Sequence, residues 1–383
     1  MDGSLFVSAG EVSGDHYIAR VFEELRSSGY SGRVCGLCGD ESRRAGVEAL
    51  WMSERLQIMG FSEILAAIGD ILKLMGEIFR SVMSLRPGVM LLADSPDFHL
   101  PLIRKLRRGG YRGKIFYISP PSVWAWRAYR VRTLRRHVDM CLPLFRFERD
   151  FLQKHDVDSL WSGHPLVEEF AGEPLDEMDI ASRVVCPSGA IDPDRVVALL
   201  PGSRRMEVEQ LYPILSEVAE NLAGRGYSPV FSVAPGLSDG AKNYLLPKLA
   251  SSGQNYFEGR GRELMALSKV VAGSSGTATA EALLLSRYMV VLYKLRPLSA
   301  IIGKILLSHI FFAIPNLLAN EMFFPELLQE RATGANATAE LLGWLEMDDE
   351  KRGAKEARMR ELAASMGRPG VYDFWAGRVL EAL

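Results

Sequence analysis

Short apolar runs that alternate with helical segments limit the folds open to this sequence of 383 residues more than any other feature. Five runs lie in the first part of the chain: 4–10, 33–39, 88–94, 114–120 and 140–145. Five more lie further on: 195–200, 228–234, 255–259, 269–275 and 289–295. Continuous apolar runs are typical of strands covered on both faces, as in a parallel sheet. Two such series in tandem predict an α/β chain with two doubly wound, Rossmann-like parallel-sheet domains that face each other across a cleft.

The segment 166–194 interrupts this alternation. It contains many acidic residues and several prolines and shows no sustained hydrophobic period, which is typical of an inter-domain linker. We therefore expect an N-terminal domain over 1–165 and a C-terminal domain over 195–367. The helical segment at about 368–383 is a candidate to pack back on the N-terminal domain.

The balance of charges argues against a dedicated nucleic-acid-binding protein. The chain has 45 basic and 47 acidic residues, a net charge of −2, whereas such proteins usually carry a strong basic excess. The N-terminus lacks the basic start and long apolar region of a signal peptide, and no apolar stretch spans a bilayer comfortably, so we expect a cytoplasmic protein. Cys35 and Cys38 form a single CxxC, which we interpret as structural thiols, and no metal site or cofactor is predicted.

Polar residues follow the first apolar run in "SAGEVSGD". Ligands of doubly wound sheets bind outside the carboxyl ends of the strands, so residues at this place are favoured as site candidates. Gly10 and Gly14 permit a close approach of the backbone. Glu11 is a candidate substrate contact, while Ser13 or Asp15 can cap the helix that follows.

Two carboxylates follow the third apolar run in "LLADSPDFHL". A carboxylate at a strand end is suited to act as a general base for a hydroxyl nucleophile, and we assign this role to Asp94. Asp97 is assigned a supporting part, with the cap of the following helix as its alternative role. His99 is a further candidate base, although a lone histidine is more often a packed or capping residue.

Two loops of the C-terminal domain combine a strand end with a helix start. In "LLPGSRRMEVE" the backbone N–H groups at the helix start and the guanidinium of Arg204 are suited to a diphosphate, with a simple turn as the alternative. "VVAGSSGTATAE" offers a second anion site, and Glu281, one turn further, is placed to accept hydrogen bonds from ribose hydroxyls. Together with the carboxylate of the other domain, they indicate a nucleotide-activated substrate and an acceptor that is deprotonated. The predicted contacts of the two loops are Gly202, Ser203, Arg204, Ser275, Gly276, Thr277 and Glu281.

The helical segment 62–85 has an unusually wide apolar face. A stripe that includes Ile68, Met75 and Val82 is expected to face the core. Further apolar residues extend the arc to about half of the circumference, more than the ~100° that a core-facing stripe needs. Either these residues are buried between neighbouring elements, or they form a patch that dips into a bilayer surface. They are Leu65, Leu72, Phe79 and Met83.

The stretch "YISPPSVWAWRAYRVRTLRRHV" places Trp124, Trp126 and Arg127 after a predicted strand and before a basic helix. We interpret the tryptophans as part of a loop beside the acceptor site. The arginines are suited to acidic lipid headgroups or to an acceptor phosphate, with a solvated helix face as the alternative.

Taken together, these motifs resemble those of the lipid-A-disaccharide synthases, bacterial glycosyltransferases of the GT-B fold. The matching pieces follow one another in order over most of the chain: "SAGEVSGD", "GFSEIL", "DSPDF", "SVWAWR", "GHPL", "LLPGSRRMEVE", "SSGTATAE" and "PNLLANE". The resemblance implies transfer of 2,3-diacylglucosamine from its UDP derivative to the 6-hydroxyl of 2,3-diacylglucosamine 1-phosphate. The new bond would be β(1→6), formed with inversion and release of UDP, without a metal or other cofactor.

The resemblance also implies a division of labour between the domains. The N-terminal domain would bind the acceptor, with Asp94 as the base, Glu11 and Asp97 near it, and Gly10, Ser13, Gly14, Trp124, Trp126 and Arg127 around it. The C-terminal domain would bind UDP along the two loops described above, with Asn316 and Glu321 completing that wall. Peripheral association with the inner membrane is expected, and a homodimer is compatible with the sequence. Family members often have asparagine where this chain has His99, so His99 receives no role from the resemblance.

Two other functions compete with this interpretation. The first is another UDP-sugar enzyme of the same fold, such as a UDP-N-acetylglucosamine 2-epimerase or a different glycosyltransferase. The wide apolar arc over 62–85 favours an acylated acceptor over this alternative. The second is a non-enzymatic membrane- or nucleic-acid-binding protein that uses the Trp/Arg stretch, but this function leaves the Asp94 loop and both anion loops without a purpose.

Overall fold

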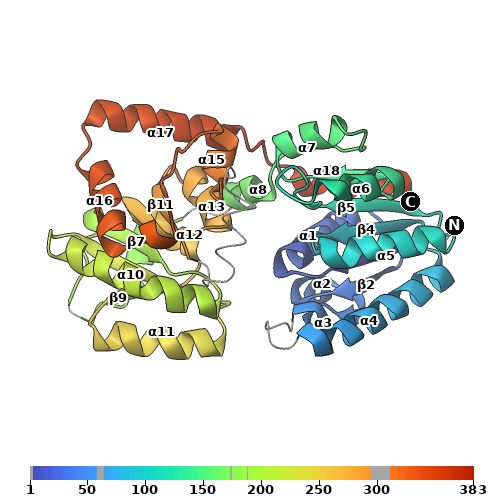
Figure 1. Ribbon diagram of the computed structural model, residues 1–383, viewed down its shortest axis with the longest axis horizontal. Helices are drawn as coiled ribbons and strands as arrows, with labels where there is room; N and C mark the ends of the chain where they lie inside the picture. Colours follow the sequence, from blue (N-terminus) through green and yellow to red (C-terminus); the bar gives the residue numbers. More distant parts are fainter. Residues whose placement is uncertain (1–2, 58–63, 173–174, 188, 295–310) are drawn as a thin grey trace. The chain divides into compact units, whose positions relative to one another are not determined.

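The computed structural model describes residues 3–57, 64–172, 175–187, 189–294 and 311–383. Within these ranges the chain forms two compact α/β units, and each unit contains one six-stranded sheet (Figure 1). The first unit comprises Met1–Glu168 and Met366–Leu383, and the second comprises Glu169–Ser365. Most of the motif "GFSEIL" lies outside the described residues.

The sheet of the first unit has the strand order β3-β2-β1-β4-β5-β6, and every neighbouring pair is parallel. Its strands are β1 (Leu5–Ala9), β2 (Val34–Cys38), β3 (Glu48–Met52), β4 (Val89–Ala93), β5 (Lys114–Ile118) and β6 (Met140–Leu142). Every residue of β1, β2 and β4 is buried, because helices cover both faces of the sheet. The helices of this part of the chain are α1 (Val12–Ser27), α2 (Asp40–Ala45), α3 (Glu54–Gln57), α4 (Ile64–Leu85), α5 (Pro96–Arg108), α6 (Val131–His137), α7 (Arg146–Gln153), α8 (Pro165–Ala171) and α18 (Val371–Ala382), with a 3₁₀ turn at Ala128–Arg130.

The two faces of this sheet build two separate core clusters. Successive side chains of a strand point to opposite faces, and β1 shows this directly. Phe6 packs in the cluster that includes residues of α4 and α5, whereas Leu5 and Val7 pack in the cluster that includes residues of α1 and α18. The sheet is therefore the central layer of three.

The C-terminal helix α18 packs against α1 in the first unit. Val371, Trp375 and Val379, spaced four residues apart on one helix face, are all buried there. Gly163 and Gly367 let the returning chain approach closely, since a Cβ on Gly367 would lie 2.5 Å from the Cα of Gly163. Residues far apart in the sequence thus complete one face of the first sheet.

The sheet of the second unit has the order β12-β11-β10-β7-β8-β9 and is also parallel throughout. Its strands are β7 (Val196–Leu200), β8 (Ser228–Val233), β9 (Asn255–Glu258), β10 (Val270–Ser274), β11 (Tyr288–Tyr293) and β12 (Glu326–Leu328). Its helices are α9 (Glu177–Ser182), α10 (Arg205–Ala223), α11 (Asp239–Ser251), α12 (Gly261–Leu267), α13 (Thr277–Leu284), α15 (Ile314–Ala319), α16 (Gly334–Leu345) and α17 (Asp349–Ala364), with 3₁₀ turns at Pro193–Arg195 and Gln329–Arg331.

The prediction of two doubly wound parallel sheets is confirmed. In each sheet the strand order reverses at one point, between β1 and β4 in the first unit and between β7 and β10 in the second. Each sheet also has an edge strand that the sequence analysis missed, β3 and β12. The side chains of β3 are exposed or half-buried, and β12 has only three residues, so neither produces a continuous apolar run.

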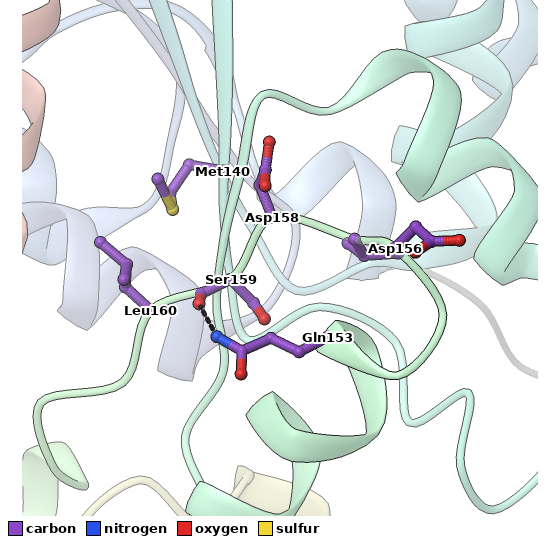
Figure 2. Close-up of a pocket in the computed structure, with 7 residues that line it drawn as sticks. Met140, Gln153, Asp156, Asp158, Ser159 and Leu160 are labelled. Carbon is purple, nitrogen blue, oxygen red and sulfur yellow. Dashed lines mark hydrogen bonds between the residues drawn. The ribbon is translucent and has the colours of Figure 1, made fainter.

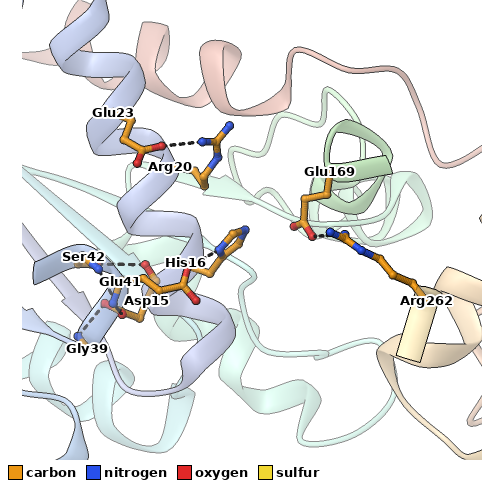
Figure 3. Close-up of polar contacts among 9 residues, drawn as sticks. All are labelled: Asp15, His16, Arg20, Glu23, Gly39, Glu41, Ser42, Glu169 and Arg262. Atoms are coloured by element: carbon orange, nitrogen blue, oxygen red, sulfur yellow. Dashed lines mark hydrogen bonds and ion pairs between the residues drawn. The ribbon is translucent and has the colours of Figure 1, made fainter. Parts of the chain in front are cut away.

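Asp15 connects α1 to the start of α2 (Figure 3). Its carboxylate accepts hydrogen bonds from three backbone N–H groups: Gly39 (2.7 Å), Glu41 (2.9 Å) and Ser42 (3.3 Å). The prediction that Ser13 or Asp15 caps the helix after β1 is wrong, because that helix already begins at Val12. Asp15 instead satisfies N–H groups at the start of the neighbouring helix, which fixes the two helices to each other.

Candidate functional site

The loops after β1 and β4 lie side by side at the point where the strand order of the first sheet reverses. The two strands are neighbours in the sheet, and their last residues, Ala9 and Ala93, are paired. The backbone N–H of Gly10 donates a hydrogen bond of 3.2 Å to Oδ1 of Asp94. Ligands of doubly wound sheets bind at such a switch point, so the fold brings the predicted catalytic residue to the expected place.

Glycine is required on the β1 side of this contact. A Cβ on Gly14 would lie 1.8 Å from Oδ2 of Asp94, and a Cβ on Gly10 would lie 2.1 Å from Oγ of Ser95. Any larger side chain at either position would push the two loops apart. The glycines of "SAGEVSGD" therefore create the space into which the carboxyl group of Asp94 fits.

The carboxyl group of Asp94 is poised to take up a proton. The residue is 9% exposed, and among the described residues Oδ2 has no hydrogen-bond partner. Burial, and to a smaller extent the negative charge of Glu11, raise the pKa of Asp94 to about 7, although hydrogen bonds from Ser95 and from the backbone of Gly10 and Glu11 oppose the shift. A group with this pKa is ionised in a useful fraction of molecules at neutral pH and is basic enough to accept a proton from a substrate hydroxyl.

The backbone of Asp94 is held in an unusual conformation. Asp94 and the next residue, Ser95, have φ angles of 51° and 45°, in the left-handed region, which costs about 1–3 kcal/mol for each non-glycine residue. The carbonyl oxygen of Asp94 accepts hydrogen bonds from Nδ1 of His99 (2.8 Å) and from the hydroxyl of Tyr117 (2.7 Å). These buried bonds offset the strain and fix the turn.

His99 is not a candidate base. The residue is completely buried, and its Nε2 is bonded to the hydroxyl of Ser8 at 2.8 Å, so both ring nitrogens are engaged. Burial lowers the pKa of His99 to about 4. The ring is therefore neutral in ordinary buffers and acts as part of the scaffold beneath Asp94.

Asp97 binds arginines and does not cap α5. The N-cap of α5 is Ser95, and the exposed carboxylate of Asp97 forms ion pairs with Arg127 (2.8 Å) and Arg130. The guanidinium of Arg127 also lies over the ring of Trp126, 4.1 Å from its centroid. Asp97 thus links the start of α5 to the tryptophan-bearing loop through these arginines. Its role in the structure is to hold that loop in place.

Trp124 and Trp126 have different surroundings. The indole N–H of Trp124 donates to Oε1 of Glu148 at 3.1 Å, and its ring packs edge-on against Phe147. Trp126 is 43% exposed and is available to a ligand. Glu148 was not among the predicted site residues, and burial raises its pKa to about 7. Its Oε2 accepts a hydrogen bond from the N–H of Phe145 at 3.3 Å, and its position three residues after Phe145 at a helix start was the signal for this contact.

Glu11 and Ser13 remain open to solvent. Both residues are exposed on the first turn of α1, next to the buried Gly10 and Gly14. Glu11 is the N-cap residue of α1, but its side chain makes no capping hydrogen bond. Its carboxylate is therefore not used by the helix, and Glu11 stays a candidate for contact with a substrate.

The second sheet brings its two predicted anion loops together in the same way. β7 and β10 are neighbours, with Leu200 paired to Gly273. A Cβ on Gly273 would lie 2.4 Å from the carbonyl oxygen of Leu200, so glycine permits the close approach of these strand ends. The loops over 201–204 and 275–277 leave the sheet directly after this contact.

The backbone N–H groups predicted to bind a diphosphate are already occupied. Oε2 of Glu207 accepts hydrogen bonds from the N–H of Ser203 (3.1 Å) and the N–H of Arg204 (3.3 Å). Gly202, with a φ of 111°, makes room for this carboxylate, since a Cβ there would lie 2.6 Å from Oε2. The prediction needs correction: an anion binds these N–H groups only by displacing Glu207. The side chain of Arg204 is 78% exposed, and its Nη1 forms a long ion pair of 3.6 Å with the same Glu207.

The second anion loop is more open. Gly276, with a φ of 124°, is the N-cap of α13, and both Gly276 and Thr277 are exposed. The hydroxyl of Ser275 donates to the carbonyl oxygen of Phe312 at 3.1 Å and so links this loop to the segment before α15. The start of α13 therefore presents an accessible helix N-terminus beside the Arg204 loop.

Glu281 lies half-buried on α13, one turn beyond Thr277. Burial raises its pKa, and the positive charge of Arg262 opposes the shift. Arg262 also forms an ion pair with Glu169 at 3.6 Å (Figure 3). The carboxyl group of Glu281 thus belongs to a local charge cluster and remains a candidate to accept hydrogen bonds from ribose hydroxyls.

Asn316 is a structural residue, which corrects its assignment as a UDP contact. Its side chain is completely buried, and Nδ2 donates to the carbonyl oxygen of Phe324 and to Oε1 of Glu326, both at 2.8 Å. Its Oδ1 accepts from the N–H groups of Phe323 and Phe324. All positions of the amide are used. Glu321, by contrast, is exposed and can reach a ligand.

The apolar residues of α4 divide into two groups. Leu72 is 60% exposed and Ile68, which was expected to face the core, is 45% exposed. Phe79 and Met83 are half-buried and pack against the core of the first unit, so their prediction as membrane-facing residues is wrong and burial explains them. The side chain of Leu65 lies outside the described residues. Among the described residues, no helix is long and apolar enough to cross a bilayer.

One surface depression lies away from these loops (Figure 2). It has a volume of about 410 Å³ and is lined by Met140, Gln153, Asp156, Val157, Asp158, Ser159 and Leu160. Met140 is the first residue of β6, whereas Asp94 follows the last residue of β4. The strands are parallel, so this depression lies at the amino ends of the strands, whereas Asp94 lies at their carboxyl ends. The depression is therefore not part of the candidate site.

A family model described as lipid-A-disaccharide synthetase (LpxB) matches residues 5–371. The chain belongs to this family. The lipid-A-disaccharide synthase of Azotobacter vinelandii is 35% identical over 364 residues, which cover 94% of this chain and 94% of that protein. The protein of the same name from Geobacter metallireducens is 33% identical over 385 residues, covering 99% of this chain and 97% of its own. The resemblance seen in the motifs is confirmed.

Solved structures share the fold of this member of the lipid-A-disaccharide synthetase family. A UDP-GlcNAc 2-epimerase from Neisseria meningitidis, bound to UDP-GlcNAc, matches with a TM-score of 0.65 at 13% identity, over 99% of this chain and all of that one. The spinosyn rhamnosyltransferase SpnG matches with a TM-score of 0.58 at 15% identity, over the full length of both chains. These identities show the fold alone, so they do not favour the epimerase alternative over the family match.

Proposed function

We propose that this protein transfers 2,3-diacylglucosamine from its UDP derivative to the 6-hydroxyl of 2,3-diacylglucosamine 1-phosphate, which forms the β(1→6)-linked disaccharide of lipid A and UDP. Membership of the lipid-A-disaccharide synthetase family supports the reaction. The observation in the structure that carries the proposal is the buried carboxyl group of Asp94, whose Oδ2 has no partner among the described residues. A general base for a sugar hydroxyl needs this combination of basicity and a free oxygen.

The proposed chemistry is one in-line displacement. The carboxylate of Asp94 accepts the proton of the acceptor 6-hydroxyl while the hydroxyl oxygen forms a bond to the anomeric carbon of the donor. The bond from that carbon to the diphosphate oxygen breaks on the opposite face, and its electron pair leaves with UDP. Attack from the face opposite the leaving group inverts the anomeric centre, so no covalent intermediate with the protein is needed.

The second unit is proposed to bind UDP. The exposed guanidinium of Arg204 is suited to the diphosphate, on which negative charge builds up as the bond breaks. The accessible start of α13 with Gly276 and Thr277 offers further N–H groups to the nucleotide, and Glu281 is proposed for the ribose. Glu207 would release the N–H groups of the first anion loop only if the diphosphate takes its place.

Incubation with defined substrates tests the function. The protein should convert UDP-2,3-diacylglucosamine and 2,3-diacylglucosamine 1-phosphate to a disaccharide, detected by mass spectrometry together with UDP. UDP-N-acetylglucosamine serves as the matched donor without the two acyl chains. Transfer from UDP-N-acetylglucosamine but not from the acylated donor would support a different glycosyltransferase, and conversion of UDP-N-acetylglucosamine to an epimer would support the epimerase; either result would contradict the proposed function.

Replacement of the base should remove turnover without removing UDP binding. We expect Asp94→Asn to lower kcat by about 10²- to 10⁴-fold, because general-base catalysis contributes about that much, while the Kd for UDP stays unchanged. The wild-type kcat/KM should fall as the pH drops through about 7, because Asp94 is protonated below its raised pKa. We call this fall the acid limb of the pH profile, and Asp94→Asn should lack it. Asp156→Asn, at an exposed aspartate away from the site, is the control. Near-normal turnover of Asp94→Asn would exclude Asp94 as the base.

The diphosphate contact can be isolated at Arg204. Arg204→Ala should weaken UDP binding about 10- to 100-fold in isothermal titration calorimetry, the loss expected for a charge-assisted hydrogen bond. Binding of uridine, which lacks the diphosphate, should not change. The control is Arg205→Ala, which removes the same charge from the next residue; its guanidinium is paired with Glu209 at 2.7 Å, as that of Arg204 is with Glu207 at 3.6 Å. An equal loss in both variants would mean that only the net charge matters.

Peripheral membrane binding is proposed for the exposed apolar residues of α4, next to the exposed Lys73 and Arg80. In flotation with vesicles containing anionic lipid, the double change Ile68→Ser and Leu72→Ser should reduce the bound fraction severalfold, and high salt should reduce it further. Met178→Ser, at an even more exposed apolar residue of the second unit, is the control. Binding that neither the double change nor salt alters would contradict the proposal.

A further inference from the structure

Three buried side chains from three elements meet beneath the catalytic turn. Ser8 of β1, His99 of α5 and Tyr117 of β5 are each 0% exposed. His99 Nδ1 and the Tyr117 hydroxyl both bond to the carbonyl oxygen of Asp94, at 2.8 Å and 2.7 Å, and His99 Nε2 bonds to the Ser8 hydroxyl at 2.8 Å. We call this set of three residues the Asp94 clamp.

The partners determine which nitrogen of His99 carries the proton. A carbonyl oxygen only accepts, so Nδ1–H of His99 donates to Asp94, and Nε2 therefore accepts from the hydroxyl of Ser8. Burial lowers the pKa of His99 to about 4, so the ring stays neutral and keeps this arrangement across the pH range in which Asp94 titrates. The carbonyl oxygen of Asp94 fixes the tautomer, the hydroxyl of Ser8 donates to the nitrogen that is left without a proton, and His99 delivers the hydrogen bond to Asp94.

The clamp acts where the backbone is most able to move. With φ angles of 51° and 45°, Asp94 and Ser95 form two consecutive left-handed residues, and a strained peptide of this kind relaxes by rotation unless its carbonyl group is held. If Asp94 relaxed out of the left-handed region, its φ and ψ angles would change and its Cα–Cβ bond would change direction with them. Its Oδ1 would leave the N–H of Gly10, and its Oδ2 would leave the space above Gly14.

We infer that His99 is a positioning residue for the transfer reaction: by holding the carbonyl oxygen of Asp94, it aims the carboxyl group of that residue at the acceptor hydroxyl. The inference rests on the proposed function, in which Asp94 is the base. His99 itself lies below the turn and is completely buried, so it has no surface with which to contact a substrate. Its contribution is to the direction of the carboxyl group and to the burial that keeps the carboxyl group basic.

Two amide substitutions separate this role from simple packing. His99→Asn places an N–H close to the position of Nδ1 and can still bond to the carbonyl oxygen of Asp94, whereas His99→Gln places its amide near Nε2, towards Ser8. Both remove the ring and replace it by a smaller polar side chain. We expect His99→Asn to retain most of kcat and His99→Gln to lose about tenfold or more, because a small misplacement of a catalytic group costs that much. The Kd for UDP should be the same in both variants.

The titration of Asp94 provides a readout that packing alone would not change. In His99→Gln a released Asp94 carboxyl group is less buried, so its pKa should fall below the wild-type value of about 7, and the acid limb of kcat/KM should move to lower pH. His99→Asn should keep the wild-type limb. The charged and titratable groups that face Asp94, namely Glu11 and Tyr117, are the same in both variants. Equal losses in the two variants with an unmoved limb would overturn the inference.

Two further measurements keep the test decisive. If His99→Gln fails to fold, Tyr117→Phe removes the second donor with almost no change of volume and should shift the same limb; an unshifted limb would overturn the inference. The pKa of Asp94 can also be followed without turnover, by carboxyl-carbon NMR of protein labelled at aspartate. A lower pKa of Asp94 in His99→Gln but not in His99→Asn would support the clamp, whether or not the wild-type protein makes the disaccharide. A wild-type protein that makes no disaccharide would refute only the proposed function.

Discussion

The candidate site of the first unit depends on the absence of side chains at two positions. Gly10 and Gly14 let the loops after β1 and β4 pack so closely that a Cβ at either position would overlap Ser95 or Asp94. The carboxyl group of Asp94 therefore enters the start of α1 and not the solvent, and its burial raises its pKa towards neutrality. The basicity needed for catalysis thus follows directly from how tightly two neighbouring strand ends are packed.

The two units use the same strand order but treat charge at the reversal point in opposite ways. In the first unit, Oδ2 of Asp94 is left without a partner among the described residues, which costs stability of about 1–3 kcal/mol. In the second unit, Glu207 satisfies the N–H groups of its loop in advance. A ligand that takes over those N–H groups gains only the difference between its own contacts and those of Glu207. Reactivity is favoured at the first site, whereas stability without ligand is favoured at the second.

The sequence predicted what depends on local pattern and on fold topology. Continuous apolar runs identified the buried strands, and the rule for strand ends placed Asp94 and the Arg204 loop correctly at the reversal points. It could not predict contacts made by side chains that fold back on their own chain. The carboxylate of Glu207 binds N–H groups of the predicted anion loop, and the amide of Asn316 binds backbone groups of the loop before β12. Each side chain lies close in the sequence to backbone groups that need partners. The edge strand β3 was missed for a different reason, since its side chains are exposed or half-buried and form no continuous apolar run.

The position of α18 has a consequence for how the protein is made. The second unit, Glu169–Ser365, is an insertion within the first, whose remaining piece is Met366–Leu383. Val371, Trp375 and Val379 of that piece belong to the core cluster on one face of the first sheet. During synthesis, the ribosome must therefore finish the whole second unit before this face of the first can close. Until then, the nascent chain displays an unfinished apolar surface beside α1, which gives chaperones a binding target for most of the translation time.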